Sequence, residues 1–222
     1  MSPRISLAIL VALAPMAALA EPPAPPAPAQ SAPVRAPAAA SALVSEGYKL
    51  VAEEKGVRLH RREKRAGVEF AAETSFAAPP EQVRRVLLDY PNHKRWQKHL
   101  TENKILKKTD EFLVVYQRLD VPVIDDRDFT LKVTWGADGA VLWKRFTIAN
   151  DLGPKPVEGV VRVTAHEGSW RLEPEGSKGT RALYRFHFDA GGSIPSWLGK
   201  GQAQDDIIDF MKRLERELPN YR

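Results

Sequence analysis

The sequence predicts an α+β fold in which a long, curved antiparallel β-sheet is covered by a helix at the C-terminus. Along residues 128–135, as in several other segments, every second residue is apolar, which is the period of a strand with one buried face. Short polar turns such as residues 137–139 join these segments and indicate antiparallel hairpins. The last segment of the chain has apolar residues at helical spacing, and it is the one element long enough to cover such a sheet.

The first twenty residues have the composition of a secretory signal peptide. A single basic residue, Arg4, precedes an apolar run over residues 5–19, and Ala18-Leu19-Ala20 forms a small-residue cleavage pattern. The run is short for a bilayer-spanning helix, which needs about 20 apolar residues, and an uncleaved anchor is the alternative. Residues 21–40 are dominated by Pro and Ala, which favours a disordered linker. We therefore expect an exported protein, periplasmic or secreted, with one domain over residues 41–222.

The composition limits the chemistry of this domain. The chain has no cysteine, so we expect neither disulfides nor thiolate chemistry. Its formal net charge is +5, but basic and acidic residues are interspersed, which argues against a nucleic-acid partner. The histidines lack metal-ligand spacing and no G-x-S-x-G motif occurs, so we expect no metal, no cofactor and no catalytic residue. We also expect a monomer.

Two helices are predicted in the first half of the domain. Residues 41–55 place apolar residues on one side and are followed by Gly56, a typical helix stop. A second helix begins at Pro79-Pro80, carries apolar residues at i, i+3, i+4 and i+7, and ends at Pro91. The strands predicted between them are residues 57–63 and 68–76.

The second half of the domain is predicted to be a run of strands followed by the terminal helix. The strands are residues 101–107, 111–119, 128–135, 141–148, 160–166, 169–173 and 180–188. Pro195 suits the first turn of the helix. The apolar stripe of the helix consists of Ala203, Ile207, Phe210, Met211, Leu214 and Leu218, and we expect it to pack on the apolar face of the sheet.

Several motifs occur in the order and spacing of lipid-transfer START domains, to which the chain is similar over residues 41–218. The motifs are DYPNHKRW at 89–96, RDF at 127–129, GVVRV at 159–163, WRLEP at 170–174, Thr180 with Tyr184, and DAGGSIPSW at 189–197. The chain departs from the family at Gln97, where an aspartate is usual. The resemblance implies a helix-grip fold, with the sheet wrapped around the C-terminal helix and a lipid-sized cavity between them. It also implies a carrier without enzymatic activity that holds one lipid.

The resemblance implies which residues line that cavity. They are Phe70, Val114, Tyr116, Arg127, Phe129, Leu131, Val133, Trp135, Tyr184, Phe186, Ile207, Phe210, Met211 and Leu214. Sterol-binding members of the family have a buried acid and a buried base on two of these strands, and ungapped matching puts Val114 and Val133 at those positions. Periodicity alone leaves open a core filled by the same side chains.

Arg127 and Asp128 are adjacent at the start of a predicted strand, so their side chains point to opposite faces. They are interpreted as a structural ion pair to a neighbouring loop, or as polar groups at the floor of the cavity, for which Arg127 is the better candidate. The alternative function is an enzyme similar to polyketide cyclases, with Arg127, Tyr116 or Tyr184 as polar groups in a pocket of the same fold.

Two segments are candidates for a gate. The Pro-rich loop at 149–159, which contains Leu152, lies where the family has a loop that gates the tunnel, and an ordinary surface connection is the alternative. Gly191 and Gly192 precede the terminal helix and are interpreted as a flexible joint, or as a tight turn with positive φ. The loop at 149–159 and the apolar residues 121–124 are candidates for transient contact with a membrane surface.

Overall fold

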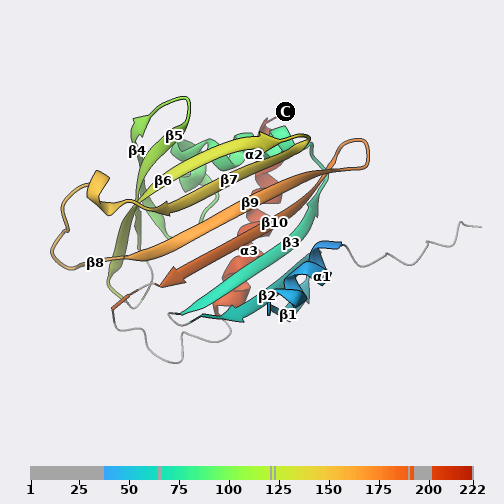
Figure 1. Ribbon diagram of the computed structural model, residues 1–222. Coiled ribbons are helices and arrows are strands. Elements are labelled where there is room, and N and C mark those ends of the chain that lie inside the picture. The colour runs from blue at the N-terminus through green and yellow to red at the C-terminus, as the bar shows by residue number, and fades with distance from the viewer. Residues whose placement is uncertain are drawn as a thin grey trace, which may run out of the picture. The chain divides into compact units, whose positions relative to one another are not determined.

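The computed structural model describes residues 38–64, 67–120, 122, 124–189, 191–192 and 202–221 (Figure 1). The predicted signal peptide, nearly all of the predicted linker and residues 193–201 lie outside these ranges. The strands are β1 (Lys49–Glu54), β2 (Val57–Glu63), β3 (Val68–Phe76), β4 (Leu100–Lys108), β5 (Phe112–Leu119), β6 (Asp126–Asp138), β7 (Val141–Ile148), β8 (Val160–Arg162), β9 (Ala165–Glu175) and β10 (Gly179–Asp189).

The described strands form a single sheet in the order β1-β2-β3-β10-β9-β7-β6-β5-β4. Every neighbouring pair in this order is antiparallel, and short β8 pairs with β6 in parallel. The two edge strands, β1 and β4, do not pair with each other, so the sheet is curved but not closed. The predicted long antiparallel sheet is confirmed.

The helices occupy both faces of this sheet. They are α1 (Ala38–Ser45), α2 (Pro80–Leu88) and α3 (Gln202–Glu217), with the 3₁₀ segments η1 (Tyr90–Arg95), η2 (Asn150–Leu152) and η4 (Leu218–Tyr221). In Figure 1, α3 lies behind the sheet and α1 lies in front of it. We call the face that packs against α2 and α3 the inner face and the other one the outer face. No helix of the described residues is long and apolar enough to cross a membrane.

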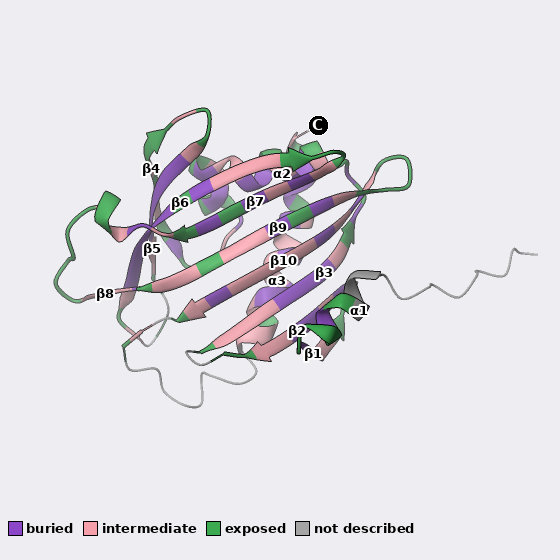
Figure 2. Cartoon of the chain, viewed as in Figure 1, coloured by how far each residue is buried: buried purple, intermediate pink, exposed green. Residues whose placement is uncertain are grey.

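Side-chain alternation explains why α3 covers the inner face. Ala72, Trp170 and Ala182 point inward and share one buried cluster with Met211 and Leu214 of α3. On the outer face, short α1 covers much less of the sheet. Figure 2 shows the resulting alternation of buried, intermediate and exposed positions along the strands. The prediction that a C-terminal helix covers one face is therefore confirmed.

The prediction of a helix over residues 41–55 is wrong after Ser45. The helix ends at Ser45. Gly47, just after it, has a φ of 85°, in the left-handed region that glycine adopts without strain. Residues Lys49–Glu54 then form β1, and Lys55 and Gly56, with φ values of 52° and 76°, make the two-residue turn of a hairpin with β2. Gly56 is thus a hairpin glycine and not a helix stop.

Other boundaries differ by less. Pro91 does not end the helical region, because the chain continues from α2 into η1, where Pro91 lies in the first turn. The two strands predicted at 160–166 and 169–173 are divided differently, into short β8 and long β9. The predicted start of the terminal helix at Pro195 falls outside the described residues, which enter α3 at Gln202.

Candidate functional site

A cavity of about 80 Å³ lies between the inner face and the helices that cover it. Five strands, α2, η1 and α3 contribute to its wall. The lining residues are Leu87, Tyr90, His93, Gln97, Gln117, Leu131, Lys144, Phe146, His166, Trp170, Tyr184 and Phe210. Pockets for drug-sized molecules usually have about 300–1,000 Å³, so this cavity is smaller than the lipid-sized space that the resemblance implies.

Three of the predicted wall residues line this cavity, namely Leu131, Tyr184 and Phe210. The others on the inner face and on α3 pack around it. Phe129, Val133 and Trp135 belong to a cluster with Tyr90 and Phe146, whereas Phe70, Phe186, Ile207, Met211 and Leu214 belong to the cluster beneath α3. The inner face is therefore filled around Met211 and Leu214 of α3 and hollow next to Tyr184 and Phe210.

Val114 and Tyr116 do not face the cavity, and the prediction that they do is wrong. In the pairing of β5 with β6, Val115 lies opposite Leu131, which places Val114 and Tyr116 on the outer face. A shift of one residue moves every side chain of a strand to the other face. The ungapped match was therefore shifted by one residue in this strand, and it assigned to the cavity the residues that point to the outer face. The inward residues of this strand include Leu113, Val115 and Gln117.

Asp128 is a structural residue of the outer face. It is fully buried and accepts hydrogen bonds from Arg162 Nε at 2.7 Å and Arg162 Nη2 at 3.0 Å. The hydroxyl of Tyr116 donates to the same carboxylate at 3.1 Å, and burial together with this contact raises the pKa of Tyr116 to about 12. Arg127 points the opposite way, to the inner face, where it is 1% exposed and donates to the carbonyl of Asp125.

Aromatic rings form the most regular part of the cavity wall. The ring of Tyr184 stacks on Trp170 at 4.4 Å and on Phe186 at 4.8 Å between centroids. Phe210 of α3 approaches Tyr184 at 5.7 Å and Trp96 at 5.5 Å. This stack joins the sheet to the covering helix, so a shift of α3 would change the size of the cavity directly.

The cavity also has polar groups that the sequence analysis did not identify. Lys144 is 5% exposed, and burial lowers its pKa to about 7. Burial and the nearby Lys144 lower the pKa of His93 to about 3, and burial lowers that of His166 to about 4, so both imidazoles are neutral at pH 7. His93 Nε2 lies 3.0 Å from the carbonyl of Val86, and His93 Nδ1 is buried without a partner. The sequence did contain an indication of Lys144: it alternates in phase with Leu142 and Phe146, at a position of the strand where an apolar residue is expected.

The glycines of one predicted gate segment lie next to β8, the strand that follows the other predicted gate segment. Gly191 and Gly192 have φ values of 61° and 63°, and a Cβ atom added to Gly192 would lie 3.3 Å from Val161 Cγ2 of β8. The loop before β8 is held by Arg162, which donates to the carbonyl of Pro154 at 3.1 Å. Leu152 of this loop is half exposed. The left-handed glycines fit a tight turn as well as a joint.

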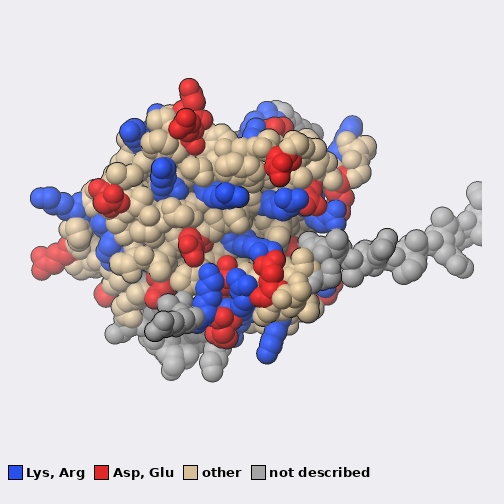
Figure 3. Space-filling view, viewed as in Figure 1, with Lys and Arg blue, Asp and Glu red and all other residues tan. Residues whose placement is uncertain are grey.

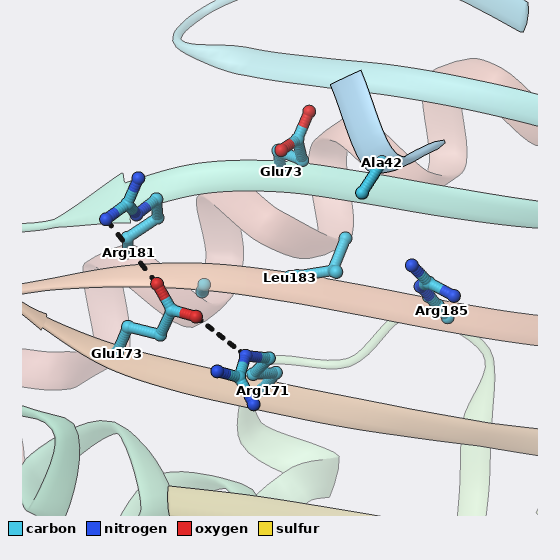
Figure 4. Close-up of a pocket in the computed structure, with 8 residues that line it drawn as sticks. Ala42, Glu73, Arg171, Glu173, Arg181, Leu183 and Arg185 are labelled. Atoms are coloured by element: carbon cyan, nitrogen blue, oxygen red, sulfur yellow. Dashed lines mark hydrogen bonds and ion pairs between the residues drawn. The ribbon is translucent and has the colours of Figure 1, made fainter. Parts of the chain in front are cut away.

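A second cavity, of about 240 Å³, lies on the outer face beside α1 (Figure 4). It contains charged side chains that pair with one another: Glu173 bridges Arg171 at 2.6 Å and Arg181 at 3.4 Å. Arg185, which points away from this group in Figure 4, pairs with Glu46 at 2.6 Å. Since these charges are already paired and partly solvated, we interpret the pocket as a structural gap beneath α1.

The charges of the outer face do not gather into a patch of one sign (Figure 3). Figure 3 shows the outer face, where Lys and Arg are interspersed with Asp and Glu. In the described parts of the chain, no group of three or more His, Asp or Glu side chains could hold a metal ion.

Comparisons with known proteins agree with this architecture. Residues 76–215, more than half of the chain, match the family described as polyketide cyclase / dehydrase and lipid transport. Human phosphatidylcholine transfer protein is 26% identical over 190 residues, which cover 81% of this chain and 87% of that protein. An uncharacterized protein of Pseudomonas aeruginosa is 27% identical over 77% of this chain and 86% of its own length. The STAR-related lipid transfer protein of Xanthomonas axonopodis superposes with a TM-score of 0.71 at 26% identity, covering 78% of this chain and 99% of that structure.

Proposed function

Since the chain belongs to the family of polyketide cyclases, dehydrases and lipid-transport proteins, we propose that it binds one lipid between the inner face and α3 and carries it between membranes. The similarity to lipid-transfer START domains is confirmed by relatives that match most of the chain. The observation that carries the proposal is the cavity beneath α3, which is walled by Leu131, Trp170, Tyr184 and Phe210.

The physical advantage of such a carrier is the removal of lipid tails from water. Each methylene exposed to water costs about 0.8 kcal/mol, so an 18-carbon chain costs on the order of 14 kcal/mol in solution. The apolar part of the cavity wall, which includes Leu131, Trp170 and Phe210, would offset part of this cost. Because the cavity has about 80 Å³ in this structure, α3 must move away from the sheet when a lipid is loaded.

The route of entry is proposed to lie at Gly191, Gly192 and the loop that contains Leu152. A Cβ atom added to Gly191 or Gly192 would lie 3.4 Å or 3.3 Å from a Val161 methyl group, so these glycines lie next to β8, the strand that follows the loop. Rotation at Gly191 and Gly192 would let the helix move while the sheet stays fixed. We propose that the exposed Leu152 contacts the membrane surface during this step.

Export is the second part of the proposal, and it rests on the composition of residues 1–40. Residues 1–20 would be removed as a signal peptide, the residues from 21 up to the start of α1 at Ala38 would be a linker, and the monomeric domain would act in the periplasm or outside the cell. N-terminal sequencing of the protein from an envelope fraction should begin at Glu21 or close to it. Intact Met1 or Ser2 on a cytoplasmic protein would contradict export.

Lipid extraction and native mass spectrometry of the purified protein test the carrier function. The expected result is one bound lipid per chain, together with transfer of that lipid between donor and acceptor vesicles. The family also contains cyclases, and turnover of a polyketide-like aromatic substrate without bound lipid would favour the enzymatic alternative. In that case Arg127 and Tyr184 would be the polar groups to test, since Tyr116 lies on the outer face.

A further inference from the structure

Lys144 carries a buried amine on the inner face of β7. It lies in phase with Leu142 and Phe146, and its Nζ donates to the carbonyl of Leu87 at 3.0 Å. The same nitrogen lies 4.8 Å from the ring centroid of Tyr90 and 5.8 Å from that of Phe146. An ammonium group has three N–H donors, and one carbonyl with two ring faces satisfies them only in part.

Among the described residues at the cavity, no carboxylate compensates the charge of protonated Lys144. None of the described residues that line the cavity is Asp or Glu, and Lys144 is the only Lys or Arg among them. The other titratable groups facing it are His93, His166, Tyr90 and Tyr184. Burial keeps both imidazoles neutral and raises the pKa of both tyrosines, so that their hydroxyls keep their protons. A buried cation without an anionic partner is normally avoided in proteins.

We infer that Lys144 anchors the ligand, and that the ligand of the proposed carrier is an acidic amphiphile whose carboxylate or phosphate oxygen accepts a hydrogen bond from Lys144 Nζ. This inference rests on the proposed lipid-binding function and specifies its ligand class. The anionic oxygen supplies the missing partner of the ammonium, while the apolar part of the molecule lies along Leu131, Trp170 and Phe210. Lys144 Nζ takes its proton from the acid itself or from solvent. Binding is otherwise non-covalent.

A purely structural role for Lys144 makes a different prediction. Leu87 is in the last turn of α2, where a cation is favourable next to the free carbonyl groups of the helix end. A lysine that only fixed α2 would affect stability and the binding of every ligand equally. A lysine that anchors the ligand distinguishes acidic amphiphiles from neutral ones of the same length.

The test measures equilibrium binding of two matched pairs to the full domain at pH 7. One pair is hexadecanoic acid and hexadecanol, and the other is phosphatidic acid and diacylglycerol with the same chains. The intact protein should bind the acidic member of at least one pair at least tenfold more tightly. A preference in the first pair alone assigns a carboxylate, and a preference in the second pair alone assigns a phosphate.

Lys144→Gln should abolish this preference while it leaves the affinity for the neutral member within about twofold, because glutamine retains a donor for the Leu87 carbonyl but carries no charge. Lys144→Met serves if the glutamine variant does not fold, and Lys132→Gln, at an exposed position of β6, is the matched control.

Equal affinity for acidic and neutral members, or a preference that survives in the Lys144 variants, would overturn the inference but not the carrier function. Binding of neither member, with no transfer between vesicles, would overturn the carrier function itself.

Discussion

Lys144→Met is expected to stabilise the ligand-free domain at neutral pH and to remove a specific pH dependence of stability. Burial lowers the pKa of Lys144 to about 7, whereas an unfolded lysine has a pKa of about 10.4. Between these two values the unfolded state binds one more proton than the folded state, so stability rises with pH, at up to about 1.36 kcal/mol per pH unit. Below pH 7 both states are protonated, and the destabilisation by Lys144 is complete.

The magnitude follows from the two pKa values. At pH 7 the buried lysine lowers the free energy of unfolding by about 4 kcal/mol, and at pH 9.5 by about 1 kcal/mol. Methionine has a similar length and no charge, but it leaves the carbonyl of Leu87 without its 3.0 Å donor, which costs about 1–2 kcal/mol. The variant should therefore be more stable by about 2–3 kcal/mol at pH 7 and nearly equal to the parent at pH 9.5.

Urea unfolding at several pH values between 7 and 9.5 measures this difference. His93 and His166 are neutral in the folded state over this range, because burial lowers their pKa to about 3 and about 4. In the unfolded state, where a histidine has a pKa of about 6.5, they are mostly neutral. Lys155→Met, in an exposed loop, is the control and should follow the parent at every pH. The reasoning would be refuted if the difference between Lys144→Met and the parent did not change with pH.

Two further variants test the wall and the gate. Val133→Trp replaces a fully buried residue that pairs with Phe146, so it should lower stability by about 1–3 kcal/mol through overpacking and reduce lipid uptake. Loss of stability with unchanged lipid binding would indicate a filled core at this position. Val161→Cys combined with Gly192→Cys introduces two thiols into a cysteine-free chain at positions where a Cβ atom added to Gly192 would lie 3.3 Å from Val161 Cγ2. The oxidised protein should neither load nor release lipid until it is reduced. Equal transfer rates in the oxidised and reduced forms would place the entry elsewhere.

The alternation of apolar and polar residues in the sequence was sufficient to predict most strands of the sheet. β2, β3 and β7 have the predicted boundaries, although Lys144 interrupts the apolar face of β7. The helix predicted over residues 41–55 was wrong, because Leu50 and Val51 fit a helical stripe as well as a strand. The deciding contact, the pairing of β1 with β2, lies outside any local pattern.

The cavity was less predictable than the fold. The sequence could place Tyr184 and Phe210 on facing surfaces, but it could not tell which apolar residues border a space and which fill the core around it. Met211 and Leu214, for example, continue the same stripe as Phe210 and are packed without a gap. Only the three-dimensional structure distinguishes residues that border the cavity from residues that fill the core, since a cavity forms where side chains do not meet.

Lys144 connects the stability of the fold with its proposed function. An apolar residue at this position would be expected to make the domain more stable at pH 7 by the argument above, so stability does not explain a lysine there. Residues that lower stability at a cavity are often those that bind a ligand. The two effects of replacing Lys144 should therefore appear in the same variant: a gain in the stability of the ligand-free protein and a loss of preference for acidic amphiphiles. A gain in stability without that loss would mean that the charge on Lys144 has no part in ligand selection.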